Sequence, residues 1–305
     1  MENTIKLIAP AKVNLFLAVG EKTGDYHPVI NVMHTLVLHD VLYMTYSPAH
    51  KTKISIDMLQ GEDPDISIPD VKLEDNLVYK AINSIAKVSH KNFDIKVILE
   101  KNIPHQAGLG GGSSDAAAAL IGAAKIFNYD EDKLFGFAAN LGSDVPFFLN
   151  GGCALYKGRG EVFNHKIQPI NRDIVLVKPQ GENGLSTKSV YKTFDDMNIA
   201  SSLDSPFTYD EKDHKTSLSA ISKELTIADN IPLFNNLAPA SEKLMPELAE
   251  IKEFMAGKVG EDKVLLCGSG AATFAYDDDA EKYKSQGWWA CETSLANVKI
   301  RPREV

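Results

Sequence analysis

The stretch that decides the fold is Pro104–Asp115, which reads PHQAGLGGGSSD and leads into the alanines at 116–119. Four of the five residues from 108 to 112 are glycine. Because glycine has no side chain and tolerates positive φ, successive backbone N–H groups of such a loop can converge on an anion. We expect a helix to follow as far as about Phe127, with Ser113–Asp115 supplying its N-cap. The stretch therefore predicts a phosphate-binding loop beside the positive end of a helix.

The loop differs from the two commonest phosphate-binding motifs. A Walker A loop ends in Gly-Lys followed by Ser or Thr, and no lysine follows these glycines. A Rossmann fingerprint that starts at Gly108 would need a third glycine at the position of Ser113. The remaining alternative is a flexible glycine turn that happens to precede a helix. The strand and helix expected on either side favour phosphate binding over that alternative.

Strands and helices are intermixed on both sides of this loop. Alternating or continuous apolar residues predict strands at 5–19, 29–46, 52–58, 93–100, 172–178 and 263–267. Apolar residues three and four apart predict helices at 75–88, 131–141 and 236–255, the last interrupted at Pro246. The polar stretch 195–232 reads as a surface excursion with at most one helix. This mixture indicates an α+β or mixed α/β protein.

Length and composition limit the class of protein. With 305 residues, 44% of them hydrophobic, the chain is an ordinary globular protein of about two domains. We place the boundary near residue 165, which gives domains 1–165 and 166–305. The 32 basic and 41 acidic residues leave a net charge of −9. A general nucleic-acid binder is more often basic, so we expect no nucleic-acid partner and look for local features that hold any anionic ligand.

The cysteines and the apolar segments indicate where the protein works. Three widely spaced cysteines, without a CxxC or zinc-type spacing, favour a reduced intracellular setting. The first twelve residues do not read as a signal peptide, and no 18-residue apolar stretch occurs. We therefore expect a cytoplasmic protein that has no membrane partner and is a monomer or a weak homodimer.

Several other residues are candidates for chemistry, each with an ordinary alternative. Asp144 stands just before Val145-Pro146, where it would either cap a helix or place a carboxylate near a transferred phosphoryl group. Lys12 shares a strand face with Asn14, but a lysine on a strand is common. Gly268-Ser269-Gly270 follows an apolar strand and reads either as a ligand-binding loop or as a plain strand-to-helix connection. The glycines at 151–152 and 158–160 are more typical of hairpin turns than of a ligand site.

Taken together, these segments resemble the conserved blocks of the GHMP kinases. The blocks are APAKVNLFL at 9–17, Tyr26-His27, the loop at 108–116, LGSDVPFFL at 141–149 with two following glycines, and residues 268–273. The resemblance spans residues 9 to about 275, and the combination is more specific than any single block. The Gly-Gly-Gly-Ser-Ser form and the Tyr-His pair resemble the motifs of one branch of the family. That branch phosphorylates cytidylyl-methylerythritol in the non-mevalonate isoprenoid pathway. In that branch the pair usually follows Asp-Gly, whereas here it follows Gly24-Asp25.

The resemblance implies a fold and a set of roles. The N-terminal domain would be like ribosomal protein S5 domain 2, the C-terminal domain ferredoxin-like, and the site would lie between them. ATP would be the donor and Mg²⁺ would accompany it, with Ser114 as a weak candidate ligand. Phosphate binding would fall to Pro104, Gly108, Leu109, Gly110, Gly111, Gly112, Ser113 and Ser114. Asp144 would be the catalytic carboxylate, kept ionised and oriented by Lys12, and it would act either as a base or by positioning the alcohol.

The remaining roles implied by the resemblance concern the small-molecule acceptor. Contacts to it would come from Asn14, Tyr26, His27, Tyr191, Gly268 and Ser269, and the two tyrosines would lie on opposite faces of the cytosine. Alternatives are another small-alcohol kinase of the family, of the homoserine or mevalonate type, or a non-catalytic ligand sensor on the same fold. The Tyr-His pair and Tyr191 argue against the first alternative, and an intact Lys12 and Asp144 argue against the second.

Overall fold

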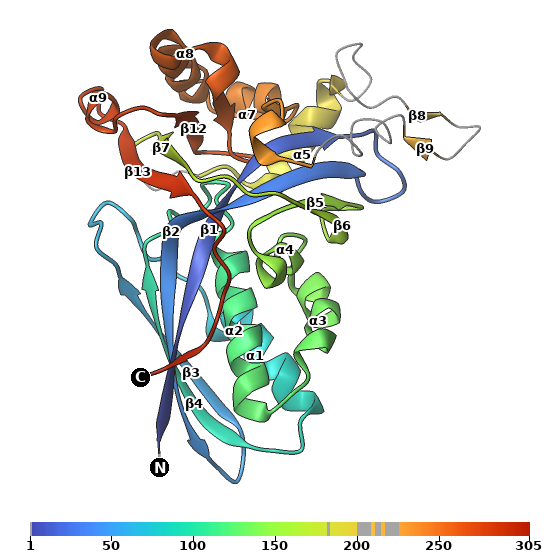
Figure 1. Cartoon of the computed structure of the whole chain (residues 1–305), viewed down its shortest axis with the longest axis vertical. Helices are drawn as coiled ribbons and strands as arrows, with labels where there is room; N and C mark the ends of the chain where they lie inside the picture. The colour runs from blue at the N-terminus through green and yellow to red at the C-terminus, as the bar shows by residue number, and fades with distance from the viewer. Residues whose placement is uncertain (1, 182–183, 200–208, 211–214, 217–225) are drawn as a thin grey trace.

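A long antiparallel ribbon runs through the whole molecule. The computed structural model describes residues 2–181, 184–199, 209–210, 215–216 and 226–305. The ribbon consists of β1 (Asn3–Val19) and β2 (Val29–Pro48) (Figure 1). At one end of β2 the sheet continues through β4 (Phe93–Lys101) to β3 (Lys53–Gln60). At the other end it continues through β5 (Cys153–Lys157) to β6 (Val162–Ile167).

Four helices cover one face of this part of the sheet (Figure 1). They are α1 (Leu77–Val88), α2 (Gly111–Phe127), α3 (Leu134–Leu141) and α4 (Val145–Asn150). The central one, α2, is buried almost all round and contacts the other three as well as β1. Its small residues permit this close packing, since a Cβ at Gly122 would lie 2.4 Å from the sulfur of Met44. The alanine-rich sequence thus buries α2 from Ser114 onward, while its first three residues stay partly exposed.

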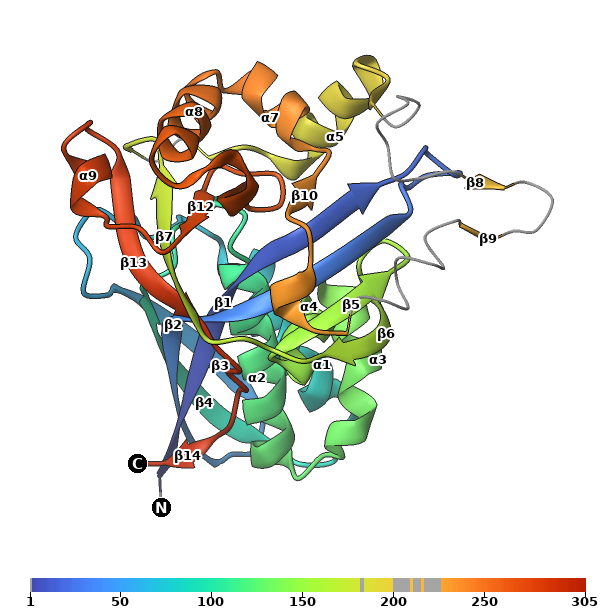
Figure 2. The same cartoon turned by 45° about the horizontal axis from the view of Figure 1, so that its top comes forward.

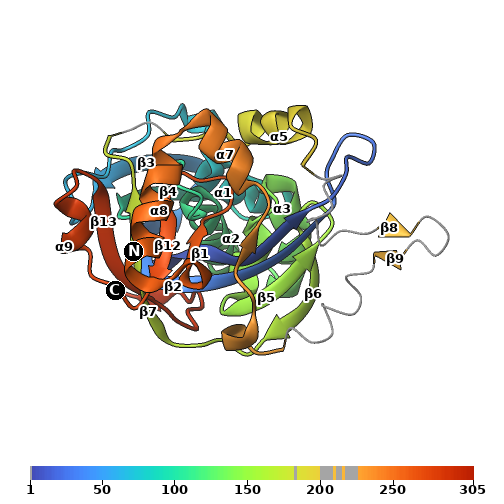
Figure 3. The same cartoon turned by 90° about the horizontal axis from the view of Figure 1, so that it is seen from above.

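The C-terminal part extends the sheet by antiparallel strands and has its own helices. Its strands run in the order β13-β7-β12-β11, namely Trp289–Leu295, Arg172–Lys178, Thr273–Tyr276 and Val264–Leu266. The helices α5 (Thr187–Asp196), α7 (Ala238–Leu244) and α8 (Glu247–Val259) lie together, with α7 between the other two (Figures 2 and 3). The short helix α9 (Glu281–Lys284) and the two-stranded pair β8 (Tyr209–Asp210) and β9 (Lys215–Thr216) complete this part.

The two parts share one continuous sheet and part of their core. Leu295 of β13 pairs with Leu36 of β2, and β10 (Phe234–Asn235) runs parallel to β1. The C-terminal segment returns to the first strand, where β14 (Arg303–Glu304) pairs with Ile5 and Lys6, so both termini lie at the same end (Figure 2). One core cluster combines residues of β1 with residues of β7, β12 and β13. A division near residue 165 stays a prediction.

The architecture confirms the α+β class and most of the expected elements. The helix expected at 236–255 is interrupted as predicted, because α7 ends at Leu244 and Pro246 caps α8. The glycines at 151–152 and 158–160 flank the hairpin strand β5, as expected. The expected N-cap of α2 is wrong. Gly110 occupies the cap in a left-handed conformation, which glycine adopts readily because it has no side chain. The helix therefore starts at Gly111.

Part of the chain lies outside the described residues, including most of the expected excursion at 195–232. Its beginning belongs to α5, which the sequence did not predict. Within the ranges described above, no helix is both long enough and apolar enough to cross a membrane.

Candidate active site

A cavity of about 1140 Å³ opens beside the N-terminus of α2. Residues of β1, the β1–β2 loop, the glycine loop, the start of α4, α5 and the loop after β11 line it, so both parts of the chain contribute. Nearly all the predicted site residues border it: Lys12, Asn14, Tyr26, His27, Pro104, Gly108–Ser113, Asp144, Tyr191, Gly268 and Ser269. Ser114 does not. It is completely buried below the loop, and its hydroxyl has no hydrogen-bond partner among the described residues.

The glycine loop has the backbone conformation that its sequence requires. Gly108 and Gly110 have φ values of +76° and +73°. A Cβ at Gly110 would lie 2.9 Å from the Phe148 ring and 3.0 Å from Cγ of Lys12, so only glycine fits there without a shift. The first intrahelical bond of α2 runs from Ser114 N–H to Gly110 C=O. The N–H groups of residues 111–113 therefore have no acceptor within the helix and border the cavity, as an anion site needs.

Backbone contacts hold the loop between the two parts of the protein. Lys12 N–H donates to Leu109 C=O at 2.9 Å. On the other side, Ala271 N–H and Ala272 N–H donate to the carbonyls of Gln106 and Ala107 at 3.1 and 3.0 Å. A Cβ at Gly108 would overlap the carbonyl oxygen of Cys267 at 1.9 Å. The position of the loop is thus fixed by strand β1 and by the second small-residue loop.

Lys12 and Asp144 form an ion pair at the edge of the cavity. The two residues are far apart in the sequence, but Lys12 Nζ lies 3.3 Å from Asp144 Oδ2. The same ammonium donates to Asn14 Oδ1 at 2.8 Å, and Asn14 Nδ2 donates to Asn31 Oδ1 at 2.7 Å. Register shifts on both sides of Lys12 and Asn14 interrupt the β1–β2 pairing, as bulges that re-aim side chains do. A buried lysine is thereby oriented by two oxygen acceptors.

Asp144 occupies the cap position of α4 but does not act as a cap. Its side chain makes no capping hydrogen bond, and its carboxylate faces Lys12 instead. About 30% of the side chain is exposed, on the side that borders the cavity. Of the two interpretations of this aspartate, the geometry favours the one in which it serves the site.

Aromatic residues also line the cavity. Gly24 and Asp25 make the turn before Tyr26, and the positive φ of Gly24 (+62°) explains why glycine can come first in this order. Tyr26 is 44% exposed toward the cavity. The ring of Tyr191, from α5, packs against His27 with a centroid distance of 5.4 Å. Burial, and then the charge of Asp144, raise the pKa of Tyr191, so its phenol keeps its proton.

His27 is held by two oxygen atoms. Its Nδ1 lies 2.9 Å from Gly20 O and its Nε2 lies 3.1 Å from Asp195 Oδ1. Both ring nitrogens are thus occupied, and the histidine ties the β1–β2 loop to α5. A contact to a ligand would have to use its backbone or its ring edge.

The loop after β11 completes the cavity next to the ion pair. A Cβ at Gly268 would lie 3.3 Å from Asn14 Oδ1 and 3.6 Å from Lys12 Nζ. The hydroxyls of Ser269 and Thr187 are 3.1 Å apart, which links this loop to the start of α5. The interpretation of 268–270 as a plain connection is therefore incomplete, because the loop borders the site.

Sequence reasoning missed several polar residues at the cavity. Asn31 extends the Lys12–Asn14 chain, and an asparagine inside the apolar run VINVM was the signal for it. Asp195 was missed because it pairs with His27 only through the placement of α5. Lys101 and Asp115, which also line the cavity, form a buried cluster with Asp40 from a third element.

Comparisons with known proteins show which family the chain belongs to. Residues 76–152 match the model of the GHMP kinases N terminal domain. The chain is 34% identical to the 4-diphosphocytidyl-2-C-methyl-D-erythritol kinase of Desulfitobacterium hafniense, over 92% of this chain and 91% of that one. It is 37% identical to the enzyme of the same name from Pelotomaculum thermopropionicum, over 91% and 90%. A solved structure of 4-(cytidine 5'-diphospho)-2C-methyl-D-erythritol kinase superposes with a TM-score of 0.69 at 28% identity and covers 97% of this chain and 100% of that one.

The fold and the glycine loop at the head of α2 are those of the GHMP kinases. The chain belongs to this family and, within it, to the 4-diphosphocytidyl-2-C-methyl-D-erythritol kinases.

Proposed function

We propose that this protein transfers the γ-phosphoryl group of ATP to the 2-hydroxyl of 4-diphosphocytidyl-2-C-methyl-D-erythritol. The observation that carries the proposal is the Lys12–Asp144 ion pair, 3.3 Å long, in the same cavity as the free N–H groups at the start of α2. A phosphate cradle and an oriented carboxylate in one cavity are what phosphoryl transfer to an alcohol needs. The names of the relatives supply the acceptor.

The proposed mechanism relies on positioning and charge. The N–H groups of residues 111–113 and the α2 dipole hold the phosphates of ATP. Asp144 accepts the proton of the acceptor hydroxyl as the new oxygen–phosphorus bond forms and the bond from the γ-phosphorus to the β–γ bridging oxygen breaks, which releases ADP. Lys12 keeps the carboxylate turned toward the acceptor, and Asn14 fixes Lys12 in turn. Equally, Asp144 could serve mainly by positioning the hydroxyl, in which case it contributes little as a base.

Magnesium fits this site as a companion of ATP. Mg²⁺ in kinases is held by substrate phosphates, waters and only one or two protein oxygens. The described residues contain no group of three or more His, Cys, Asp or Glu side chains placed for a metal. We keep Ser114 as the proposed protein oxygen; its hydroxyl is buried below the loop without a hydrogen-bond partner among the described residues, so the side chain would have to turn toward the cavity to reach the ion. The ion would offset the negative charge of the phosphates.

The other wall of the cavity would bind the cytidylyl end of the acceptor. Tyr26 offers an exposed ring for stacking on the cytosine, and Tyr191 offers a second aromatic surface that is held in place by His27. Gly268 and Ser269 would approach the acceptor beside Asn14. The contact of His27 would come from its backbone or ring edge, because both of its nitrogens are occupied.

We also propose that the enzyme works in the cytoplasm as a monomer or weak homodimer. Three free cysteines support a reducing compartment. Size-exclusion chromatography with light scattering, at several protein concentrations, tests the oligomeric state.

A coupled assay of ADP release tests the function. The purified protein is given ATP and Mg²⁺ with cytidylyl-methylerythritol, mevalonate or homoserine in separate reactions. We expect turnover with the cytidylyl acceptor only. Turnover with mevalonate or homoserine instead would assign another activity of the family, and ATP binding without any turnover would favour the sensor.

A further inference from the structure

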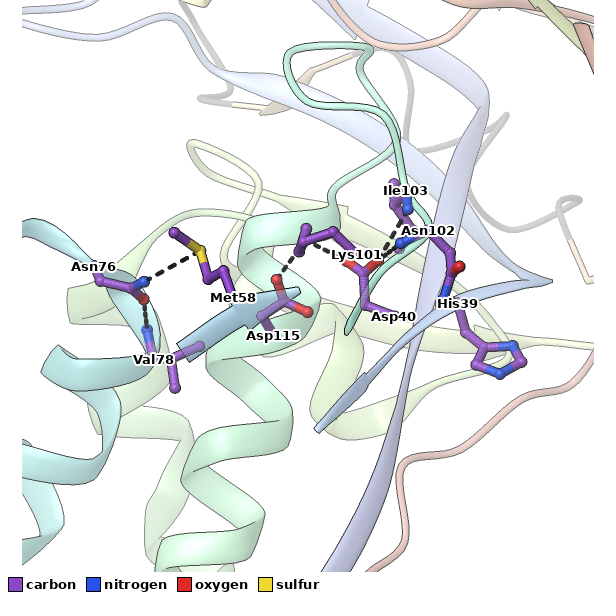
Figure 4. Close-up of polar contacts among 9 residues, drawn as sticks. All are labelled: His39, Asp40, Met58, Asn76, Val78, Lys101, Asn102, Ile103 and Asp115. Carbon is purple, nitrogen blue, oxygen red and sulfur yellow. Dashed lines mark hydrogen bonds and ion pairs between the residues drawn. The ribbon is translucent and has the colours of Figure 1, made fainter. Parts of the chain in front are cut away.

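Three charged side chains from three elements meet directly below the glycine loop (Figure 4). Lys101, the last residue of β4, donates from Nζ to Oδ2 of Asp40 on β2 and to Oδ2 of Asp115 on α2, the latter at 2.7 Å. All three residues are at least 95% buried. We call them the stem cluster, because Lys101 precedes the glycine loop and Asp115 follows it.

The stem cluster holds the two ends of the loop together. The Lys101–Asp115 bond links the residue before the loop to the second turn of the helix after it, which closes residues 102–110 at their base. Asp40 adds a third point, because its Oδ1 accepts from the backbone N–H groups of Asn102 and Ile103 at 2.5 and 2.9 Å. A Cβ at Gly111 would lie 3.5 Å from Asp40 Oδ2. The cluster thus lies directly against the first residue of the helix that presents the free N–H groups.

Stability alone is a weak reason to bury this arrangement. Taking charges out of water costs several kcal/mol for each ion, and well-packed apolar residues are often as stabilising. The second oxygen of Asp115, Oδ1, has no hydrogen-bond partner among the described residues. Burial raises the pKa of Asp115 to about 7, although Lys101 opposes the shift. Burial lowers the pKa of Lys101, but the two carboxylates outweigh it and raise that pKa above its ordinary value, so the ammonium stays charged.

We propose that Lys101 and Asp115 are positioning residues for the nucleotide: their bond sets the distance between the two stems of the glycine loop and thereby aims the N–H groups at the phosphates of ATP. The proposal rests on the proposed function in so far as ATP is the ligand of this loop. It requires neither residue to take part in the transfer step. It also gives the buried charges a use: once Asp115 is ionised, above about pH 7, its bond to the Lys101 ammonium is shorter and stronger than one to the neutral carboxyl group and holds the stems more firmly.

The substitution Asp115→Ala breaks the bond on the helix side only. It leaves Lys101 paired one to one with Asp40, so no buried charge is left without a partner and the variant should fold. Asp115→Asn restores an oxygen acceptor for Lys101 without the charge. Asp115→Leu is a second disruptive variant that fills more of the vacated space. Lys125→Ala is the matched control, because it removes another lysine ion pair of α2, the one with Glu304, away from the cavity.

The experiment is calorimetric titration of the folded full chain with ATP, combined with Michaelis constants for ATP and for the acceptor. We expect Asp115→Ala and Asp115→Leu to raise the dissociation constant for ATP about tenfold or more, the loss of one charge-assisted bond. Asp115→Asn should restore most of the affinity, and Lys125→Ala should bind ATP like the parent. The Michaelis constant for the acceptor should change less than that for ATP.

Three results would overturn the proposal. Unchanged ATP affinity in the alanine and leucine variants would show that the bond does not aim the loop. If Asp115→Asn binds ATP as weakly as Asp115→Ala, an oxygen acceptor for Lys101 is not what sets the affinity for ATP. Equal increases in both Michaelis constants, together with a lower melting temperature, would indicate a general packing defect. Because ATP binding is measured directly, the proposal can succeed or fail even if the cytidylyl acceptor is not phosphorylated.

Discussion

Lys12 shows how a single residue carries the chemistry of the site. A lysine with 3% of its surface exposed needs acceptors that compensate for lost water, and the chain supplies Asn14 and Asp144. The pattern APAKVNLFL could be predicted to place Lys12 and Asn14 on one face of a strand. Their partner could not, because nothing local to residue 144 distinguishes a helix cap from a carboxylate that faces a lysine 132 positions earlier. Only the resemblance to a family joined them.

We predict that Asp144→Ala and Lys12→Ala each lower kcat by about 10²- to 10⁴-fold, the usual contribution of a positioned proton acceptor. The dissociation constant for ATP should stay within a few-fold of the parent, because the loop N–H groups are unchanged. Steady-state kinetics and calorimetry provide the two readouts.

The matched control for this prediction is Asp130→Ala. Asp130 caps the short helical turn at 131–133, where its side chain accepts from Asp132 N–H, outside the cavity. It should lose a little stability and no activity. Near-normal turnover in Asp144→Ala would show that the Asp144 carboxylate does not serve the transfer step.

The second prediction at this scale concerns the pH dependence of stability, which depends on Asp115. Its pKa is about 7 in the folded protein and 3.8 without the fold. Between these values the unfolded chain has lost a proton that the folded protein keeps, so the stability from this group is complete below about pH 4 and is lost as the pH rises through 7. A pKa that differs by one between the folded and unfolded states changes the free energy of unfolding by about 1.4 kcal/mol. Asp115→Asn removes this dependence.

Urea unfolding of both proteins at pH 5 and pH 8 measures the effect. Lys101, whose pKa lies above its ordinary value, stays charged at both pH values, and His105 is present in both proteins, so the difference between the two reports mainly on Asp115. We expect the asparagine variant to gain relative to the parent as the pH rises. A difference that does not change with pH would mean that the carboxyl group titrates normally.

At the scale of elements, the glycine loop is the part of the site that sequence predicts best. Close contacts and positive φ require glycine at 108 and 110, and four glycines in five positions are difficult to explain without a ligand. The error at its end is instructive. Ser113–Asp115 are typical N-cap residues, but Gly110 takes the cap and Asp115 turns to Lys101, because a buried lysine is a stronger partner than a backbone N–H. N-cap propensity reflects only the residues next to the helix in sequence. Lys101 lies on β4, so this propensity could not predict the pairing.

Gly108→Ala tests whether the loop conformation depends on glycine. The new Cβ would lie 1.9 Å from the carbonyl oxygen of Cys267, at a φ of +76°. Backbone would have to move on both sides, and we expect a loss of at least about 1–3 kcal/mol of stability together with most of the ATP affinity. Thermal melting and ATP titration report the two effects.

Gly136→Ala is the control, because this helical glycine of α3 has open space around its Cβ position. It should raise stability by about 0.5–1 kcal/mol and leave ATP binding unchanged. Similar behaviour of the two alanine variants would argue against a special role for Gly108.

At the scale of the whole molecule, the sequence predicted two domains with the site between them. The structure agrees that both parts line the cavity. It also joins them through one sheet, a shared core cluster and a C-terminal segment that returns to β1. These pairings, such as Leu295 with Leu36, span most of the chain. Local patterns identify the strands but not which strands pair, so this continuity could not be predicted.

The shared core predicts one cooperative unfolding transition for the full chain. A fragment of residues 1–165 would expose apolar residues of β1, including Val13 and Leu15, that pack with β7 and β12. We expect it to show no sharp thermal transition by calorimetry. Two separate transitions in the full chain, or a stable fragment, would support two independent domains divided near residue 165.

The central claim is that the backbone N–H groups at the start of α2 hold a triphosphate next to the carboxylate of Asp144. A crystal structure with a non-hydrolysable ATP analogue, Mg²⁺ and cytidylyl-methylerythritol measures this most directly. The account predicts the phosphates over residues 108–114 and the acceptor 2-hydroxyl within about 3.2 Å of a carboxylate oxygen of Asp144. A triphosphate bound elsewhere, or an acceptor hydroxyl far from Asp144, would contradict it.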